Sequence, residues 1–388
     1  MNPKSPPPFD VNRPSAVASA IFLGTVGVLS FIVQPGLVQG FVSVLSFSDA
    51  RANDVVGIEM TGVALATIIV ATLGERINWR KLTLAALILA VGGDLASAAL
   101  THSTAFAAAR FVAGLGHGAI ISLSFTYVGL TIHTARNIAF YLVALLSYGA
   151  IGLWILPTIL GHFGFGPVFI FFAAVCAIAL LTVRHVPQSS QGRVEISPTA
   201  VQHSATWIAV ALAGVLAYNL AQGIAWANLA LIGSAAHMAD QKVADDLFIS
   251  QMVAVVGALL SVALAGRMRR GLLVAIGIVG GALFIALLIG SPSPWVFLLA
   301  VCGFNFLWNF VLPFILSVVG DFDVHGRVMS PAIAMQMIGL GLGPIISARL
   351  LGAGGFFGVE ATCIVFFAAS LMLLAGPMIT HGHRLAAR

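Results

Sequence analysis

The sequence predicts an all-α membrane protein with twelve transmembrane helices, and three observations support this fold class. Of the 388 residues, 60% are hydrophobic and only 8% are charged, which leaves too little polar surface for a soluble domain of this size. The apolar residues form long uncharged runs of roughly 20 residues, which suit membrane-spanning helices and not alternating strands of about ten. The basic residues gather in the short connectors between these runs.

Six predicted spans make up the first half of the chain. A Pro-rich polar N-terminus, residues 1–15, precedes them, and we expect it to be disordered. Each span is an apolar run long enough to cross a bilayer; their ranges are 16–40, 55–73, 82–100, 105–131, 138–160 and 167–183.

The second half repeats this pattern after a polar stretch, residues 184–206, that we interpret as a linker. A short polar tail, 381–388, follows the last span. The six apolar runs of this half cover 207–235, 247–265, 272–290, 295–319, 328–351 and 359–379.

Lysine and arginine are distributed unequally between the two sides of the predicted membrane. If the connectors are numbered alternately from the N-terminus, nearly all basic connector residues share its side, and only Arg51, Lys242 and Arg349 fall opposite. Cytoplasmic loops carry the excess of basic residues. We therefore expect both termini and the linker to be cytoplasmic, in a multi-pass protein of the cell inner membrane.

Similar features recur at an offset of about half the chain. A glycine followed by basic residues comes after the second span, at Gly74, and again after the eighth, at Gly266. The fifth and eleventh spans both combine several glycines with a proline, Pro157 and Pro344. Two related halves, 16–183 and 207–380, form the parallel-repeat arrangement of rocking transporters.

The fourth span departs from the others because Arg110 and His117 lie within its apolar sequence. A charge in the hydrocarbon core costs at least about 2.5–3.5 kcal/mol, so Arg110 needs a partner or a water-filled cavity. Gly114 and Gly118 are four residues apart, and they let another backbone approach one face of this helix.

On these residues the chain resembles the major facilitator superfamily from the first span to the twelfth. Arg110 and the glycines that follow it are similar to the family's fourth-span pattern. The family's basic loop after the second span is present in altered form, with Asn78 in place of a glycine. The fifth span resembles the family's antiporter motif, but Leu153 stands where that motif has Gly-Pro. The resemblance implies two pseudo-symmetric six-helix bundles and a secondary transporter.

In that family the basic loop locks the outward-facing state. The resemblance therefore implies a gating loop made of Glu75, Arg76, Arg80 and Lys81. The alternative is that these residues only set the topology of the chain. Asp321 and Asp323, in the corresponding connector of the second half, are candidate partners for this loop.

Glu59, Asp94 and Arg110 are each about six residues from the outer end of their predicted helices, or roughly 9 Å in depth. We predict that Arg110 pairs with one or both carboxylates, and that one carboxylate couples transport to a proton, since a nearby cation and desolvation shift a carboxylate's pKa in opposite directions. The alternatives are a static ion pair and a Glu59 at headgroup level. Histidine is the residue type whose ordinary charge change lies closest to neutral pH, so His117 is a secondary candidate; the alternative is a hydrogen-bonded core histidine.

The spans of the second half are expected to lack internal charges and to carry stripes of amide and indole side chains. Neutral donors and acceptors on an apolar body suit a neutral or zwitterionic solute with rings or hydroxyl groups. The alternatives are helix packing through amides and interfacial anchoring by tryptophan. The candidate cavity residues are Asn219, Gln222, Trp226, Gln251, Asn305, Trp308 and Asn309, with Gln34 and Tyr148 from the first half.

The function that these features predict is secondary active transport of a small organic solute by alternating access, coupled to protons. An uncoupled facilitator and a non-transporting membrane sensor or assembly protein are the alternatives. The sequence has none of the nucleophile, zinc-protease or P-loop motifs, so neither an enzyme nor an ATP-driven pump is expected. We expect no cofactor, no metal site and no nucleic-acid partner. We expect the protein to be a monomer. Its expected partners are the lipid bilayer and the solute.

Overall fold

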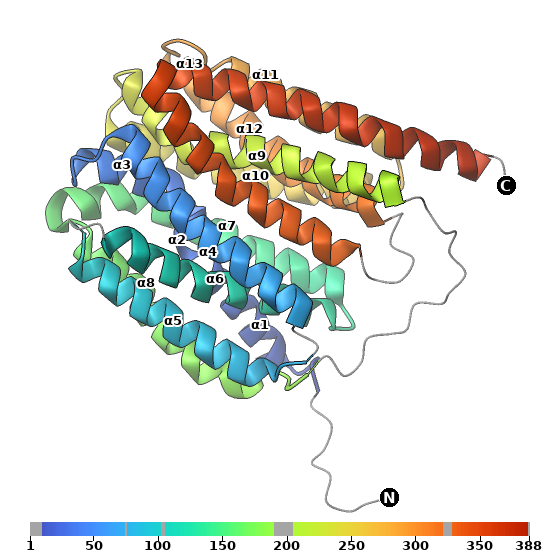
Figure 1. Cartoon of the computed structure of the whole chain (residues 1–388), viewed down its shortest axis with the longest axis horizontal. Coiled ribbons are helices and arrows are strands. Elements are labelled where there is room, and N and C mark those ends of the chain that lie inside the picture. The colour runs from blue at the N-terminus through green and yellow to red at the C-terminus, as the bar shows by residue number, and fades with distance from the viewer. Residues whose placement is uncertain (1–9, 74–75, 102–104, 190–204, 321–327, 387–388) are drawn as a thin grey trace, which may run out of the picture.

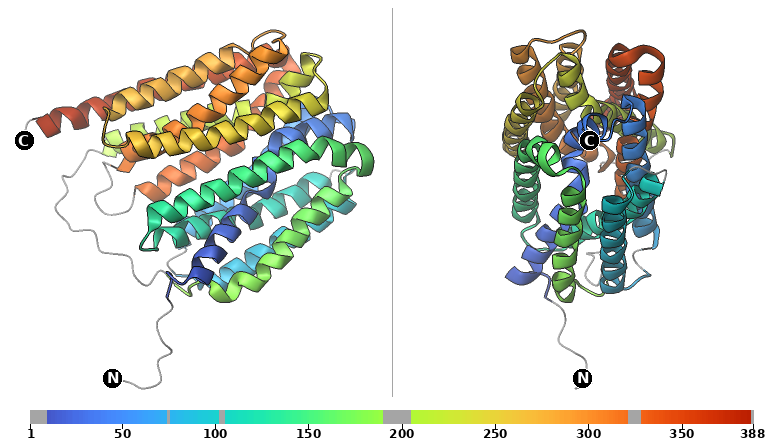
Figure 2. Two further views of the ribbon diagram at one scale, coloured as in Figure 1. Left: turned by 180° about the vertical axis from the view of Figure 1, so that it is seen from behind. Right: turned by 90° about the vertical axis from the view of Figure 1, so that its left-hand side faces the viewer.

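The computed structural model describes residues 10–73, 76–101, 105–189, 205–320 and 328–386, and every regular element in these ranges is a helix. Within these ranges, ten candidate spans are long and apolar enough to cross a membrane. Two shorter apolar helices, Pro14–Gly27 and Arg270–Ala286, accompany them. Neighbouring helices lie lengthwise against one another (Figures 1 and 2). The chain is a multi-pass, all-helical membrane protein.

Local sequence accounts for several helix ends in the first half. The side chain of Asn78 accepts hydrogen bonds from the backbone N–H groups of Arg80 and Lys81 and so caps α5. Gly164, with φ of 69°, ends α7 in a conformation that glycine adopts easily. The helices of this half are α1 (Pro14–Gly27), α2 (Leu29–Ile32), α3 (Gln34–Ser43), α4 (Asp49–Leu73), α5 (Trp79–Ala99), α6 (Ala105–Gly129), α7 (Thr134–Phe163), α8 (Gly166–Ala179) and the 3₁₀ helix η1 (Leu180–His185).

The described residues of the second half form five helical elements. The last is bent at Gly355, whose φ of 69° is non-helical, so it provides two candidate spans, Pro331–Ala353 and Gly355–Met378. The elements are α9 (Ala205–Ala235), α10 (Asp240–Leu264), α11 (Arg270–Ala286), α12 (Pro294–Gly320) and α13 (Met329–Ala386).

The first predicted span, 16–40, is not one continuous helix. It is divided into α1, α2 and α3, because Val28 (φ −114°, ψ 12°) and Val33 (φ −102°, ψ 11°) leave the helical conformation. All three pieces are rich in apolar residues. Hydrophobicity, which predicted the span, carries no signal for either break.

Helices α1 to α8 pack mainly on one another, and so do α9 to α13 (Figure 1). The two groups meet where α13 packs on α4, α7 on α10 and α3 on α9. We call the end of the molecule that holds Ser43, Asp49 and Asp240 the predicted outer end, and the opposite end the predicted cytoplasmic end.

Glycines bring α4, α5 and α6 unusually close together. A Cβ added to Gly114 would lie 2.1 Å from the carbonyl oxygen of Glu59, and one added to Gly118 would lie 2.3 Å from that of Val63. Gly116 approaches α5 in the same way, with an added Cβ 2.5 Å from the oxygen of Ala86. The predicted close packing on the Gly114–Gly118 face is therefore present, and α4 is the partner.

We predict that Gly118→Val lowers the melting temperature of the detergent-solubilised protein, because the new side chain would force α4 away from α6. Overpacking of this kind typically costs about 1–3 kcal/mol. Gly92→Val is the matched control, since it has the same loss of helix flexibility but an added Cβ meets nothing within 4 Å. Equal melting temperatures for the two variants would contradict this packing.

Candidate functional site

The guanidinium group of Arg110 is fully buried and binds both predicted carboxylates. Its Nε donates to Glu59 Oε2 at 3.0 Å and its Nη2 donates to Glu59 Oε1. Its Nη1 donates to Asp94 Oδ1 at 2.7 Å and to Ser97 Oγ at 3.3 Å. The ring of Phe169 lies 4.9 Å from the guanidinium carbon and covers its face. Arg110 therefore has a partner for each of its three nitrogens.

Two further side chains extend this cluster toward the first span. The hydroxyl of Ser30, in α2, donates to Glu59 Oε1. The imidazole of His117 lies between Val26 and Asp94, with Nδ1 3.0 Å from the Val26 carbonyl oxygen and Nε2 3.3 Å from Asp94 Oδ2. His117 lies two turns along α6 from Arg110, so the two side chains bind opposite oxygens of one carboxylate.

The contacts of His117 require one more proton than a neutral imidazole beside an ionised carboxylate can supply. The Val26 carbonyl only accepts, so Nδ1 has to carry a hydrogen. Asp94 Oδ2 also only accepts when the carboxylate is ionised. A second hydrogen must therefore sit on Nε2 or on Asp94 Oδ2.

The balance of charge gives the same result. Arg110 contributes one positive charge, and ionised Glu59 and Asp94 contribute two negative charges. One extra proton makes the buried cluster neutral, whereas its loss leaves a net negative charge in a membrane interior. Uncompensated buried charge is strongly unfavourable, so a neutral cluster requires one extra proton.

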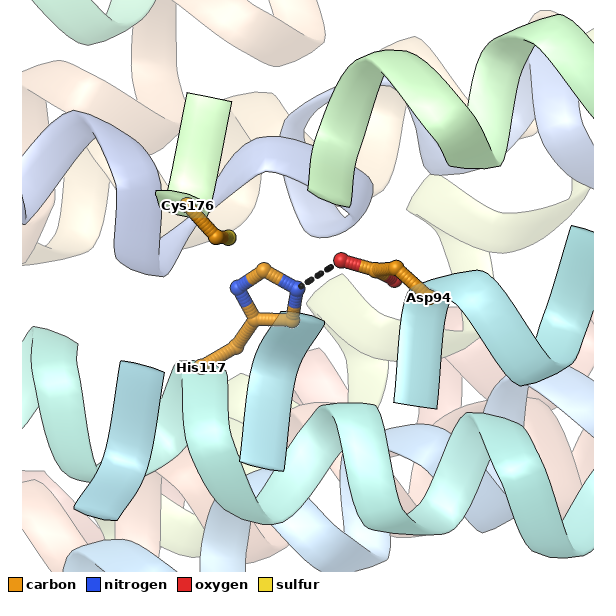
Figure 3. A group of neighbouring side chains, drawn as sticks. All are labelled: Asp94, His117 and Cys176. Carbon is orange, nitrogen blue, oxygen red and sulfur yellow. Dashed lines mark hydrogen bonds and ion pairs between the residues drawn. The ribbon is translucent and has the colours of Figure 1, made fainter. Parts of the chain in front are cut away.

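Cys176, in α8, lies beside the same imidazole (Figure 3). Its sulfur, an oxygen of Asp94 and a nitrogen of His117 lie within 4.8 Å of one another. Asp, His and Cys are metal ligands by type. However, Asp94 already shares its charge with Arg110, and a guanidinium this close opposes a metal cation. The geometry therefore suits a proton better than a metal ion.

A narrow cavity connects His117 with the boundary between the two groups of helices. The space available to water is about 20 Å³, enough for one water molecule. Ser30 and His117 provide polar lining, and Met337 and Leu340 of α13 close the side that belongs to the second half. Water in this cavity would reach the imidazole.

Aromatic side chains from both halves meet beside this cavity. The indole N–H of Trp226 donates to the Phe31 carbonyl oxygen at 2.9 Å. The ring of Trp308 lies 6.4 Å from that of Phe31 and 5.8 Å from that of Trp226, both in edge-to-face geometry. We call Phe31, Trp226 and Trp308 the aromatic cluster.

The predicted amide residues are not gathered with these rings as a set. Asn305 donates to Ser250 Oγ and so joins α12 to α10, whereas Asn219 donates to Val215 O and Asn309 to Asn305 O within their own helices. Gln222 donates to the hydroxyl of Tyr218. Among these four bonds, only the one from Asn305 to Ser250 connects two helices.

Four buried amides of the predicted cavity set keep polar atoms without a partner among the described residues. The atoms without a partner are Nε2 and Oε1 of Gln34, Nε2 of Gln251, Oδ1 of Asn219 and Oε1 of Gln222. Buried amide atoms are normally satisfied, so these are the amide groups of the predicted set that remain available to a solute. Tyr148 is not available in this way, because its hydroxyl donates to the Leu29 carbonyl oxygen at 2.8 Å.

Only part of the predicted gating loop can be placed. Glu75, Asp321 and Asp323 lie outside the described residues. Arg76 and Lys81 are exposed, and Arg80 donates through Nε to Val186 O at 2.5 Å. Arg80 thereby connects the start of α5 to the segment after η1.

Two features were missed by reasoning from the sequence. The expectation that spans of the second half lack internal charges is wrong: Glu360, in the segment Gly355–Met378, is 2% exposed, and neither oxygen has a partner among the described residues. A single acid near the end of an apolar run was the available signal.

The second missed feature is a set of polar contacts between the halves at the predicted outer end. Gln39 Nε2 donates to Ser234 Oγ and to Asp240 Oδ1, both at 2.7 Å, and Asn53 Nδ2 donates to Asn228 Oδ1 at 3.0 Å. Gln241 with Thr158 and Trp154, and Arg349 with Asp54, add further polar contacts between α1–α8 and α9–α13 at this end. This arrangement is the one expected when the outer end is closed.

Comparison with known proteins identifies the family to which this architecture belongs. A family model described as Major Facilitator Superfamily matches residues 16–344. The chain belongs to the major facilitator superfamily. This membership makes it a membrane transporter and not an enzyme.

Solved structures of other transporters resemble the chain over nearly its whole length. A D-xylose-proton symporter matches with a TM-score of 0.73 and 16% identity, over 92% of this chain and 96% of that one. The nucleoside transporter NupG matches with a TM-score of 0.70 and 15% identity, over 94% and 99%. The xylose transporter XylE from E. coli, in an inward open conformation, matches with a TM-score of 0.72 and 16% identity, over 92% and 95%. At such identities the likeness is one of fold. No curated protein sequence matches the chain.

We predict that Arg110→Met lowers the melting temperature strongly, because it leaves two buried carboxylates without a cation. Removing one partner of a buried ion pair typically costs about 3–5 kcal/mol. Adding Glu59→Gln to Arg110→Met should recover part of the loss. Arg13→Met is the control, since the Arg13–Asp10 pair is exposed, with side chains 70% and 52% accessible. An Arg110→Met protein as stable as the parent would show that the cluster does not need its cation.

Proposed function

We propose that this chain is a proton-coupled secondary transporter that moves a small neutral organic solute by alternating access. The observation that supports coupling most directly is the need for one extra proton between Asp94 and His117. The proton is held there in one state of the cycle and released when the surroundings of the pair change. Glu59 and Arg110 hold Asp94 in place and set the charge that the proton has to balance.

The proposed architecture has twelve crossings in two six-helix bundles, 16–183 and 207–380. It counts the interrupted helices α1–α3 and the short helix α11 as one crossing each. The segment 184–206 connects the bundles. With residues 1–15 and 381–388 on the cytoplasmic side of a cell inner membrane, the basic connectors follow the positive-inside rule.

The contacts between the two groups of helices support a cycle in which the outer end opens and closes. Gln39, Asn53, Asn228 and Asp240 would hold the outer end closed in the present state. Breaking these contacts while forming others at the cytoplasmic end would expose the central region to the outside. The gating role of Arg76, Arg80, Lys81 and Glu75 belongs to that second state.

The chemistry of the central region supports a neutral solute. The aromatic cluster offers ring faces and edges, and the unpartnered amides of Gln34 and Gln251 offer neutral donors and acceptors. No lysine or arginine lines the cavity beside His117. A solute with an apolar ring and hydroxyl or amide groups would match this lining, as do the sugars and nucleosides named for the structurally similar transporters.

An uncoupled facilitator is the second candidate within transport. It would use the same cavity, and the Arg110 cluster would then serve only to pack α4, α5 and α6. The proton requirement of His117 argues against it, since a static cluster could be made neutral with one carboxylate. A sensor or assembly protein lacks comparable support.

The test is uptake of a panel of sugars, nucleosides and other neutral solutes into proteoliposomes, with and without a pH gradient. We predict accumulation above equilibrium only with the gradient. Asp94→Asn leaves Arg110 balanced by Glu59 alone, so the cluster is neutral without the extra proton. This variant should lose gradient-driven accumulation while it keeps solute exchange.

Asp10→Asn is the control for loss of an acid far from the site, and it should behave like the parent. An Asp94→Asn protein with unchanged pH dependence would remove Asp94 as the proton site. A panel of solutes that all equilibrate without any response to the gradient would favour the facilitator.

A further inference from the structure

The interrupted first span lies between the proton site and the aromatic cluster. The breaks at Val28 and Val33 leave α2 as a single turn, Leu29–Ile32. Carbonyl groups in and beside this turn accept hydrogen bonds from side chains of three other helices. His117 of α6 binds Val26 O, Tyr148 of α7 binds Leu29 O, and Trp226 of α9 binds Phe31 O.

Trp226 makes this segment a bridge between the two halves of the transporter. The indole is 1% exposed, and its N–H bond to Phe31 O joins α9 to the first span near the middle of the helices. On the other side of the same turn, Ser30 donates to Glu59, which binds Arg110. Residues 26–31 therefore contact both the ion-pair cluster and the aromatic cluster.

The protonation state of the Asp94–His117 pair decides whether His117 can hold the first span. With the extra proton, the imidazole serves Val26 O through Nδ1 while Nε2 shares a hydrogen with Asp94. Without it, a neutral imidazole beside ionised Asp94 has one N–H for two acceptors. Hydrogen bonds to an ionised partner are roughly twice as strong as neutral ones, so the remaining hydrogen goes to Asp94. Val26 O then loses its donor.

We propose that His117 is a proton-controlled latch on the first span: the loaded pair holds Val26, and the unloaded pair releases it. Release frees the interrupted segment to move Phe31, and with it the Trp226 contact and the solute region. This inference rests on the proposed proton coupling and names the positioning residues that carry it, His117, Phe31 and Trp226. The titratable groups near the imidazole are Asp94, Arg110, Glu59, Cys176 and Tyr148; the residues of α13 in the cavity, Met337 and Leu340, do not titrate.

Two substitutions at His117 separate the latch from the proton. In His117→Asn the amide nitrogen takes the place of Nδ1 and can bind Val26 O at every pH. In His117→Gln the amide takes the place of Nε2 and can bind Asp94 but not Val26. The first variant should be fixed in the held state and the second in the released state.

The readout is the tryptophan fluorescence of the full chain in lipid nanodiscs during a pH titration without solute. The contribution of Trp226 is the difference between each protein and its Trp226→Phe counterpart. We expect this contribution to change with pH in the parent protein. In His117→Asn it should stay at the low-pH level, and in His117→Gln at the high-pH level. Trp295→Phe is the control, because Trp295 is 78% exposed and should not alter the pH-dependent part.

Proton release from the same samples, followed with a pH-indicator dye, separates the latch from the coupling itself. If the parent protein releases the extra proton but the Trp226 contribution does not change, the latch is wrong and the proton site stands. If no proton is released, the proposed coupling fails as well. A Trp226 response that persists in either His117 variant would also overturn the latch. The Trp226 contribution and the proton release of the parent protein test the latch even if one of these variants does not fold.

Discussion

The buried ion-pair cluster of Arg110 with Glu59 and Asp94 is the interaction on which the rest of the structure depends. A guanidinium inside the membrane is tolerable only with partners that match its charge and satisfy its N–H groups. Those partners come from α4 and α5, so both helices must pack closely on α6. Gly114, Gly116 and Gly118 make that approach sterically possible. One charged residue thus explains the packing of three helices.

The cluster has one negative charge more than Arg110 balances, and this imbalance connects structure to function. A static support would need one carboxylate. The second carboxylate, Asp94, is shared with His117, whose other nitrogen contacts the backbone of the first span. Protonation thereby becomes linked to a helix that is already interrupted. The interrupted helix in turn reaches Trp226 in the second half, so in the proposed mechanism a change of one proton has a physical route to the proposed solute region.

Much of this arrangement could be predicted from the sequence, and the failures have physical causes. Arg110 and its two carboxylates were predictable because charges at matching depth in apolar runs have few other partners. The glycine spacing predicted close packing on α6. By contrast, hydrophobicity says nothing of helix continuity, so the breaks at Val28 and Val33 were missed, although Pro35 in the first turn of α3 was an available signal for the second one. The amides of Asn219, Asn305 and Asn309 share helix faces, yet a shared face does not distinguish a cavity from a helix contact. The inter-helix role of His117 required knowing where the Val26 carbonyl lies.

The central claim is that the Asp94–His117 pair binds one proton that it can also lose. The most direct measurement is NMR of the protein in bilayers with ¹⁵N-labelled histidine and ¹³C-carboxyl-labelled aspartate, assigned with the His117 and Asp94 variants. At low pH we expect either two protonated ring nitrogens on His117 or a neutral Asp94. Raising the pH should remove this one proton in a single step shared by both residues. A His117 that stays in one neutral tautomer beside an ionised Asp94 across the whole pH range would contradict the claim.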